Sequence, residues 1–155
     1  MVARLIRDLP ADFVSLCLGI NVQGVGSLST RTFRPAVIGF VRLVREGHPG
    51  APIAVMSPIL SPPRETARNA AGLSLQDMRK EIQEAVWALR ANGDIGVHYV
   101  DGLEVFGEAE VSRLPDLLHP DAEGYRLLAV NFQHAVVESV FQGGTVPGRG
   151  GAGGR

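Results

Sequence analysis

Apolar residues gather in three short runs that predict buried β-strands. The runs are residues 13–18, 53–56 and 97–100. Each run is followed by residues typical of turns, namely Gly19, Ser57-Pro58 and Asp101-Gly102. Because the runs are nearly continuous in apolar character, we expect strands that are covered on both faces, as in a parallel sheet.

Two of the segments between these runs carry apolar residues at helical spacing. Residues 35–46 have valines on one helical face and open with a proline, which suits a first turn. Residues 74–92 give the clearest pattern, with Ser74 and Asp77 spaced as a capping box and Asn92-Gly93 as a stop signal. Both segments therefore predict amphipathic helices.

Helical patterns also lie at the two ends of this region. A last helix is predicted over residues 121–142, with Asp121 as its cap, and residues 3–8 predict the end of another helix. Strands that alternate with helices form βαβ units with right-handed crossovers. We therefore expect a parallel α/β sandwich. Three strands make a small sheet for such a fold, so the sheet looks incomplete.

Most of the chain is predicted to form one domain. At roughly 100–200 residues per domain, the 155 residues correspond to a single unit. Residues 143–155 contain seven glycines and, apart from Val146, no large apolar side chain, so we expect a disordered tail after a domain of residues 1–142. The composition, with 45% hydrophobic and 20% charged residues, is typical of a globular protein.

Charge and cysteine content exclude several classes of protein. With 15 basic and 16 acidic residues, the net charge of −1 argues against nucleic acid as the main partner. No apolar run is long enough to span a membrane, and the N-terminus has no signal-peptide core, so the default compartment is the cytoplasm unless an export signal was lost upstream. Cys17 is the single cysteine, and the four histidines lack ligand spacing, so we expect no disulfide and no metal.

Two polar clusters fall where ligands of open α/β sheets bind, at the carboxyl ends of the strands. The first is Gly19-Ile20-Asn21, and the second is the stretch 116–120 before the last helix. Asp116 and His119 are three residues apart in a turn, so the carboxylate can hold the imidazole of a general base in one tautomer. The alternative is a solvated loop acid beside a histidine that merely precedes a helix.

Asn21 has two interpretations as well. An amide at the end of a buried strand can donate a hydrogen bond to a developing oxyanion, a role worth ~2.7–4 kcal/mol. The alternative is a turn residue, because asparagine tolerates left-handed backbone geometry. Taken alone, the residue does not decide between them.

Together these motifs resemble the SGNH (GDSL-type) serine hydrolase family. The stretches that match are 7–12, Gly19-Ile20-Asn21, 57–59, and Asp116 with 119–125. The similarity spans about residues 3–141 and corresponds to roughly the C-terminal two-thirds of such a domain. The family often has an aspartate after the asparagine, where this chain has Val22.

The resemblance implies a flavodoxin-like α/β/α sandwich and hydrolysis of carboxylic esters through Ser, His and Asp. By that match His119 is the base, Asp116 orients it, and Asn21 is one oxyanion donor. No cofactor is implied, and the partner is a small-molecule ester, either a short acyl or an acetyl-sugar ester.

The nucleophile of that family has no counterpart here. It lies in a Gly-Asp-Ser block after the family's first strand, and none of the eight serines has those neighbours. We therefore expect an N-terminally incomplete domain that lacks its first strands, with no esterase activity in the chain as printed. The absent first strand would pair beside residues 13–18, so its loss leaves an apolar edge open to self-association.

Two further interpretations remain open. One is a non-catalytic, hydrolase-like binding module, and the other is a small-molecule-binding α/β domain unrelated to esterases. Residues 61–64, Ser-Pro-Pro-Arg, predict a rigid connector; the alternative is a loop that borders the acyl or alcohol pocket of a complete enzyme. His48 lies in a Gly-His-Pro-Gly turn, for which we expect solvent exposure.

Overall fold

Three parallel strands form the centre of the structure. The computed structural model describes residues 2–142, so the tail predicted over 143–155 lies outside the described residues. The strands are β1 (Val14–Cys17), β2 (Ile53–Met56) and β3 (Val97–Val100). They lie in the order β1-β2-β3, and the register places Ile53 beside Val14 on one side and Val97 on the other. The three predicted strands and their parallel arrangement are confirmed.

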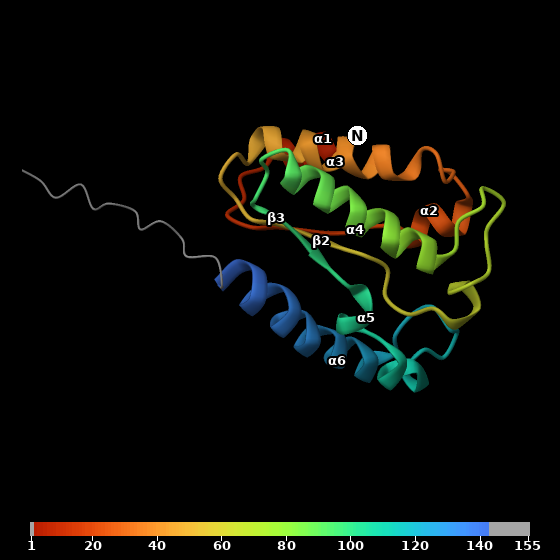
Figure 1. Ribbon diagram of the computed structural model, residues 1–155. Helices are drawn as coiled ribbons and strands as arrows, with labels where there is room; N and C mark the ends of the chain where they lie inside the picture. Colours follow the sequence, from red (N-terminus) through yellow and green to blue (C-terminus); the bar gives the residue numbers. More distant parts are fainter. Residues whose placement is uncertain (1, 143–155) are drawn as a thin grey trace, which may run out of the picture.

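Helices lie on both sides of this sheet (Figure 1). The α-helices are α1 (Val2–Asp8), α2 (Ile20–Val25), α3 (Phe33–Gly47), α4 (Leu75–Ala91), α5 (Gly102–Val105) and α6 (Ala122–Phe132). Two 3₁₀ turns, η1 (Pro62–Arg64) and η2 (Glu108–Arg113), and a π-helical segment, η3 (Gln133–Gln142), complete the described elements. Helices α1, α3 and α4 lie on one side of the strands and α6 on the other (Figure 1). None of these helices is long and apolar enough to cross a membrane.

The helix ends follow the capping signals in the sequence. The Ser74 hydroxyl accepts a hydrogen bond from the Asp77 backbone N–H at 3.2 Å, and the Asp77 carboxylate accepts one from the Ser74 N–H at 3.1 Å. This capping box starts α4 as predicted. The Asp121 carboxylate caps α6 by accepting from the Gly124 N–H at 2.7 Å. The change to π-helical winding at Gln133 had no signal in the sequence.

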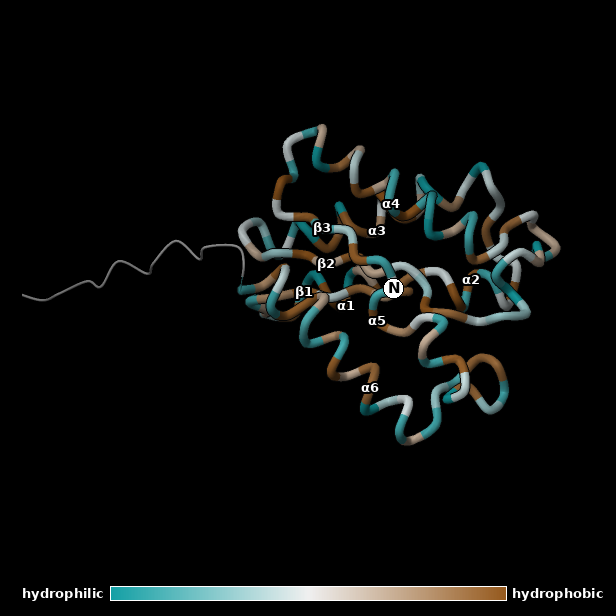
Figure 2. Tube along the Cα trace, turned by 60° about the horizontal axis from the view of Figure 1, so that its bottom comes forward, coloured by the Kyte–Doolittle hydropathy of each residue, from teal (hydrophilic) through white to brown (hydrophobic). Residues whose placement is uncertain are grey.

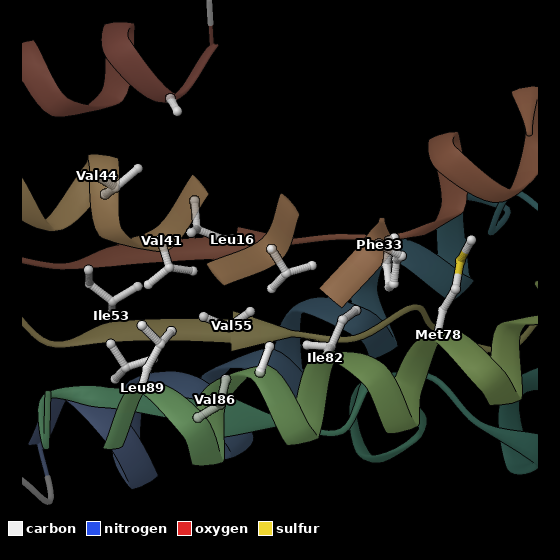
Figure 3. Close-up of a cluster of buried hydrophobic side chains, with 14 of the residues drawn as sticks. Leu16, Phe33, Val41, Val44, Ile53, Val55, Met78, Ile82, Val86 and Leu89 are labelled. Atoms are coloured by element: carbon white, nitrogen blue, oxygen red, sulfur yellow. The ribbon is translucent and has the colours of Figure 1, made fainter. Parts of the chain in front are cut away.

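The larger hydrophobic core lies between the sheet and the pair α3 and α4. Figure 3 shows side chains of both helices, such as Val41 and Ile82, meeting Val55 in the central strand. These three side chains are fully buried. At about 1.5–3 kcal/mol for each buried aliphatic side chain, such contacts supply most of the favourable free energy of folding. Along α4, brown and teal positions alternate in Figure 2, as expected of a helix with one buried face.

A smaller core lies on the opposite face, and it leaves β1 partly uncovered. Val136 and Val140 of η3 pack with Met56 of β2 and with Val100 of β3. On β1, however, Ser15 and Cys17 are exposed. The prediction of strands covered on both faces is correct for β2 and wrong for β1. The two exposed residues alternate with buried ones, which is the pattern of a strand with one buried face. The overall apolar character of the run made this alternation hard to recognise.

His48 is buried, which corrects the expected solvent exposure. Only 5% of its surface is accessible. Its Nε2 lies 2.9 Å from the carbonyl oxygen of Ile6, and since a carbonyl only accepts, Nε2 carries the proton. The histidine therefore ties α1 to the end of α3.

Candidate functional site

A cavity of about 510 Å³ opens at the carboxyl ends of β1 and β2. Its lining is mostly apolar and comes from the strand ends, from α2, from the segment after β2, and from the start of α6. The apolar residues include Ile20, Val25, Met56, Ile59, Leu60 and Leu128. Asn21 and His119 line the same cavity. The edge of a parallel sheet thus brings together two side chains that are far apart in the sequence.

A larger depression of about 770 Å³ lies at the other end of α3 and α4. Its lining contains Arg45 and Asp94, which form a bidentate ion pair with both contacts at 2.9 Å. This region precedes β2 and β3, so it lies at the amino ends of those strands. It contains none of the predicted site residues, and we place the candidate site at the smaller cavity.

The turn after β1 is made by Gly19. Its φ of 118° lies in a region that side chains with L chirality rarely adopt. A Cβ atom at this position would lie 2.7 Å from Cγ of Pro58. The glycine therefore lets β1 turn directly into α2 against the segment that follows β2. This turn places Asn21 in the first turn of α2, where its side chain is exposed at the cavity.

Asp116 and His119 form a closed hydrogen-bonded turn. The backbone N–H groups of Leu118 and His119 donate to Oδ1 of Asp116 at 3.0 and 2.7 Å. Oδ2 of the same carboxylate lies 2.7 Å from Nδ1 of His119. The bond from the His119 backbone N–H, followed by the imidazole, holds the pKa of the Asp116 carboxyl well below its usual range.

The state of Asp116 fixes the roles of the two imidazole nitrogens. An ionised carboxylate can only accept a hydrogen bond, so Nδ1 of His119 is the donor. In the neutral imidazole, Nε2 then carries the free lone pair. The pair is exposed, with the side chains of His119 and Asp116 at 67% and 54% accessibility. His119 is therefore accessible to a proton donor at the cavity.

The residues after His119 hold the loop against the start of α6. The Asp121 N–H donates to the Arg113 carbonyl at 2.8 Å. A Cβ atom on Gly124 would lie 2.9 Å from Cβ of Pro120 and 3.0 Å from Cβ of Arg113. The absence of a side chain at Gly124 thus allows the first turn of α6 to approach the segment before the Asp116–His119 turn.

Three further residues with polar or sulfur-containing side chains line the cavity. Two of them are Ser61 and Arg64, so residues 61–64 border the cavity, which was the less favoured of the two interpretations of this stretch. Cys17 also lines it. Although Cys17 is exposed along its strand, packing around the sulfur raises the pKa of the thiol. Within residues 2–142, no group of three His, Cys, Asp or Glu side chains could hold a metal ion.

The structure therefore brings the predicted site residues together. It pairs Asp116 with His119 at 2.7 Å and places His119 and Asn21 at one cavity. The catalytic roles of the three residues stay predictions, because geometry alone does not establish them.

Comparison with known proteins identifies relatives of this chain. A family model described as the GDSL-like lipase/acylhydrolase family matches residues 2–127. Among solved structures, the chain is similar to a salicylyl-acyltransferase from a tetracycline biosynthetic pathway, with 33% sequence identity and a TM-score of 0.79. That match covers 89% of this chain and 40% of the acyltransferase. A comparison with curated proteins finds no match to the sequence.

Two esterase structures share the fold at lower identity. A carbohydrate esterase family 3 protein from Talaromyces cellulolyticus is 16% identical with a TM-score of 0.65, covering 91% of this chain and 64% of the esterase. A peptidoglycan O-acetylesterase is 18% identical with a TM-score of 0.63, covering 90% and 41%. The chain thus spans less than two-thirds of the length of each of the three structures.

Proposed function

The chain belongs to the GDSL-like lipase/acylhydrolase family, and we propose that it supplies three groups of a serine ester hydrolase. His119 is the general base, Asp116 orients its imidazole, and Asn21 donates a hydrogen bond to the oxyanion. The observation that carries this proposal is the 2.7 Å contact between Nδ1 of His119 and Oδ2 of Asp116, beside the cavity that His119 shares with Asn21.

The proposed reaction follows from the roles of the two imidazole nitrogens. Nε2 of His119 takes the proton of a serine hydroxyl while the serine oxygen attacks the ester carbonyl carbon. The carboxylate of Asp116 stabilises the imidazolium that forms. The carbonyl oxygen becomes an oxyanion that accepts from the Asn21 amide. When the tetrahedral intermediate collapses, the C–O bond breaks and Nε2 returns the proton to the leaving alcohol. Water then releases the acyl group by the same steps.

The serine itself is not supplied by the cavity residues of this chain. Among the described residues that line the cavity, one is a serine, Ser61. Its hydroxyl donates a hydrogen bond to the Leu117 carbonyl at 2.8 Å and so is already engaged. Cys17 is not an activated substitute, because its raised pKa keeps the sulfur as a thiol near neutral pH. We therefore propose that the chain as printed does not hydrolyse esters and that the nucleophile comes from polypeptide outside the printed sequence.

The substrates we propose are carboxylic esters of small acyl groups. The mostly apolar lining, with residues such as Ile20, Ile59 and Leu128, suits the acyl side of an ester better than its polar alcohol. The similar structures of a salicylyl-acyltransferase, a carbohydrate esterase and a peptidoglycan O-acetylesterase are consistent with this class. Short acyl esters and acetyl-sugar esters are both included.

The test uses two proteins and a chromogenic ester. One is the printed chain, and the other is the product of the same gene expressed with any in-frame codons upstream of Met1. Hydrolysis of 4-nitrophenyl acetate is measured for each. We expect no turnover above background for the printed chain. For the longer protein we expect His119→Ala to lower kcat/KM about 10⁶-fold, and Asp116→Asn about 10⁴-fold.

Matched variants make the test specific. His134→Ala is the control, because its Nδ1 also contacts a carboxylate, that of Glu138, at 2.8 Å on an exposed helical face. Asn21→Ala is expected to cost about 10²–10³-fold in kcat. Full activity of His119→Ala in the longer protein would overturn the proposed mechanism. A longer protein without any ester turnover would favour the non-catalytic binding module instead.

A further inference from the structure

The candidate catalytic turn contains a residue in an unusual backbone conformation. Leu117, between Asp116 and His119, has a φ of 60°. Within residues 2–142 it is the single non-glycine residue with a positive φ. The left-handed region is unfavourable for a leucine because its Cβ approaches the neighbouring carbonyl oxygen. Something else in the fold must therefore hold Leu117 in place.

The side chain of Ser61 makes a contact that can hold Leu117 in this conformation. Its hydroxyl donates to the Leu117 carbonyl at 2.8 Å, across a sequence separation of 56 residues. Ser61 is almost completely buried, with 1% of its surface accessible. Its oxygen also accepts from Nη1 of Arg64 at 3.0 Å, which orients the hydroxyl proton toward Leu117.

Ser61 is itself held by a buried ion pair. The Ser61 N–H donates to Oε1 of Glu65 at 3.1 Å. Arg79 of α4 binds both carboxylate oxygens of Glu65, at 2.6 and 2.9 Å. The same guanidinium donates to the carbonyl oxygens of Pro58 and Ile59 at 3.0 and 3.3 Å. A continuous series of hydrogen bonds thus runs from α4, through the segment after β2, to the carbonyl of Leu117.

We propose that Ser61 is a positioning residue that keeps Asp116 and His119 in their paired geometry by holding the carbonyl of Leu117. The geometry on which this rests is present in the chain itself. Its importance for ester hydrolysis rests on the function proposed above. Without the Ser61 hydroxyl, Leu117 relaxes to an ordinary backbone conformation and the Asp116 carboxylate no longer faces Nδ1 of His119.

The tautomer of His119 reports this geometry directly. When Nδ1 donates to Asp116, the neutral ring carries its proton on Nδ1, and Nε2 is unprotonated. The two states are distinguished by ¹⁵N chemical shifts of the ring nitrogens in long-range ¹H–¹⁵N spectra. The measurement is made on the printed chain at about pH 9, above the ordinary histidine pKa of about 6.5. It needs no substrate and no turnover.

The test compares Ser61→Ala with a matched control. We expect His119 to carry its proton on Nδ1 in the unchanged chain and to shift mainly to the Nε2–H form in Ser61→Ala. Ser139→Ala is the control, because the Ser139 hydroxyl also donates to a carbonyl, that of His134, at 2.7 Å on an exposed face. We expect the His119 signals to stay unchanged in that control.

Two further variants keep the proposal testable. Ser61→Cys preserves the size of the side chain but donates weakly, so it replaces Ser61→Ala if that variant does not fold, and the same tautomer shift is expected. Adding Leu117→Asn should restore part of the Nδ1–H form, because asparagine tolerates the left-handed region. An unchanged His119 tautomer in a folded Ser61 variant overturns the positioning role. Unchanged ester turnover in His119→Ala overturns the proposed function instead.

Discussion

Replacing Gly19 by alanine should destabilise the fold, because this buried glycine combines a left-handed backbone with a close neighbour. A φ of 118° places the residue where L side chains are strained, which costs of order 1–3 kcal/mol. The new Cβ would lie 2.7 Å from Cγ and 3.3 Å from Cδ of Pro58. Since carbon atoms pack favourably at about 3.5–4.0 Å, the overlap adds an overpacking cost of about 1–3 kcal/mol. The expected total is about 2–6 kcal/mol.

The matched control lies five residues further along the chain. Gly24 is in α2 and is exposed, and apart from its chain neighbours and the backbone of its own helix no atom would lie within 4 Å of a Cβ added there. Alanine at this position removes backbone freedom from the unfolded chain at a helical position, so Gly24→Ala should be neutral or stabilising by up to about 1 kcal/mol. Both substitutions add the same single carbon.

Urea denaturation of the 155-residue chain, followed by far-UV circular dichroism, measures the difference. With a total stability of about 5–15 kcal/mol for a typical domain, Gly19→Ala should lower the transition midpoint strongly while the slope m stays constant. Similar midpoints for the two variants would refute the reasoning. The turn would then not depend on the left-handed backbone or on the contact with Pro58, and the placement of Asn21 would need another explanation.

Three further results are expected. Ser74→Ala removes the side-chain half of the capping box of α4 and should lower the free energy of unfolding by about 1 kcal/mol in the same assay, whereas no loss would show that the cap is redundant. Glu65→Gln removes the closer carboxylate beside the buried Arg79 and leaves only that of Asp101, at 4.0 Å from Nε, so it should cost up to about 3–5 kcal/mol. Its control, Glu123→Gln in the exposed pair with Arg126, should cost less than about 1 kcal/mol, and equal losses would argue against a buried network. The pKa of Asp116 is lowered in the folded chain, so its contribution to stability is fully present above the ordinary aspartate pKa of about 3.9 and is lost as pH falls toward the folded value. A ¹³C titration of its carboxyl should show ionisation below that pH, and an ordinary midpoint would contradict the paired geometry.

Local patterns made most of the fold predictable. The stripe on α4 and its capping box set both where the helix starts and which face is buried. The exposed face of β1 is hard to predict because Ser15 and Cys17 are small residues within an apolar run. The burial of His48 depends on its bond to Ile6, 42 residues away, and no periodicity signals such a contact.

The parts of the candidate site that could be predicted from the sequence are those formed by residues close together in the chain and those at the carboxyl ends of the strands. The i, i+3 spacing of Asp116 and His119 is enough for a turn to join them. Asn21 lines the same cavity as His119 because it follows β1 at the edge where the parallel strands have their carboxyl ends. The Ser61 contact could not be foreseen, because it joins a loop carbonyl to a serine in a distant connector and depends on the backbone of Leu117.

The segment that follows β2 holds both halves of the candidate site. Pro58 packs under the Gly19 turn that places Asn21, while Ser61 holds the turn of His119. Arg79 binds the carbonyl oxygens within this segment and, through Glu65, the N–H of Ser61. A shift of the segment would therefore move Asn21 and His119 together. This common support explains how two loops that are far apart in the sequence keep a fixed position relative to one another.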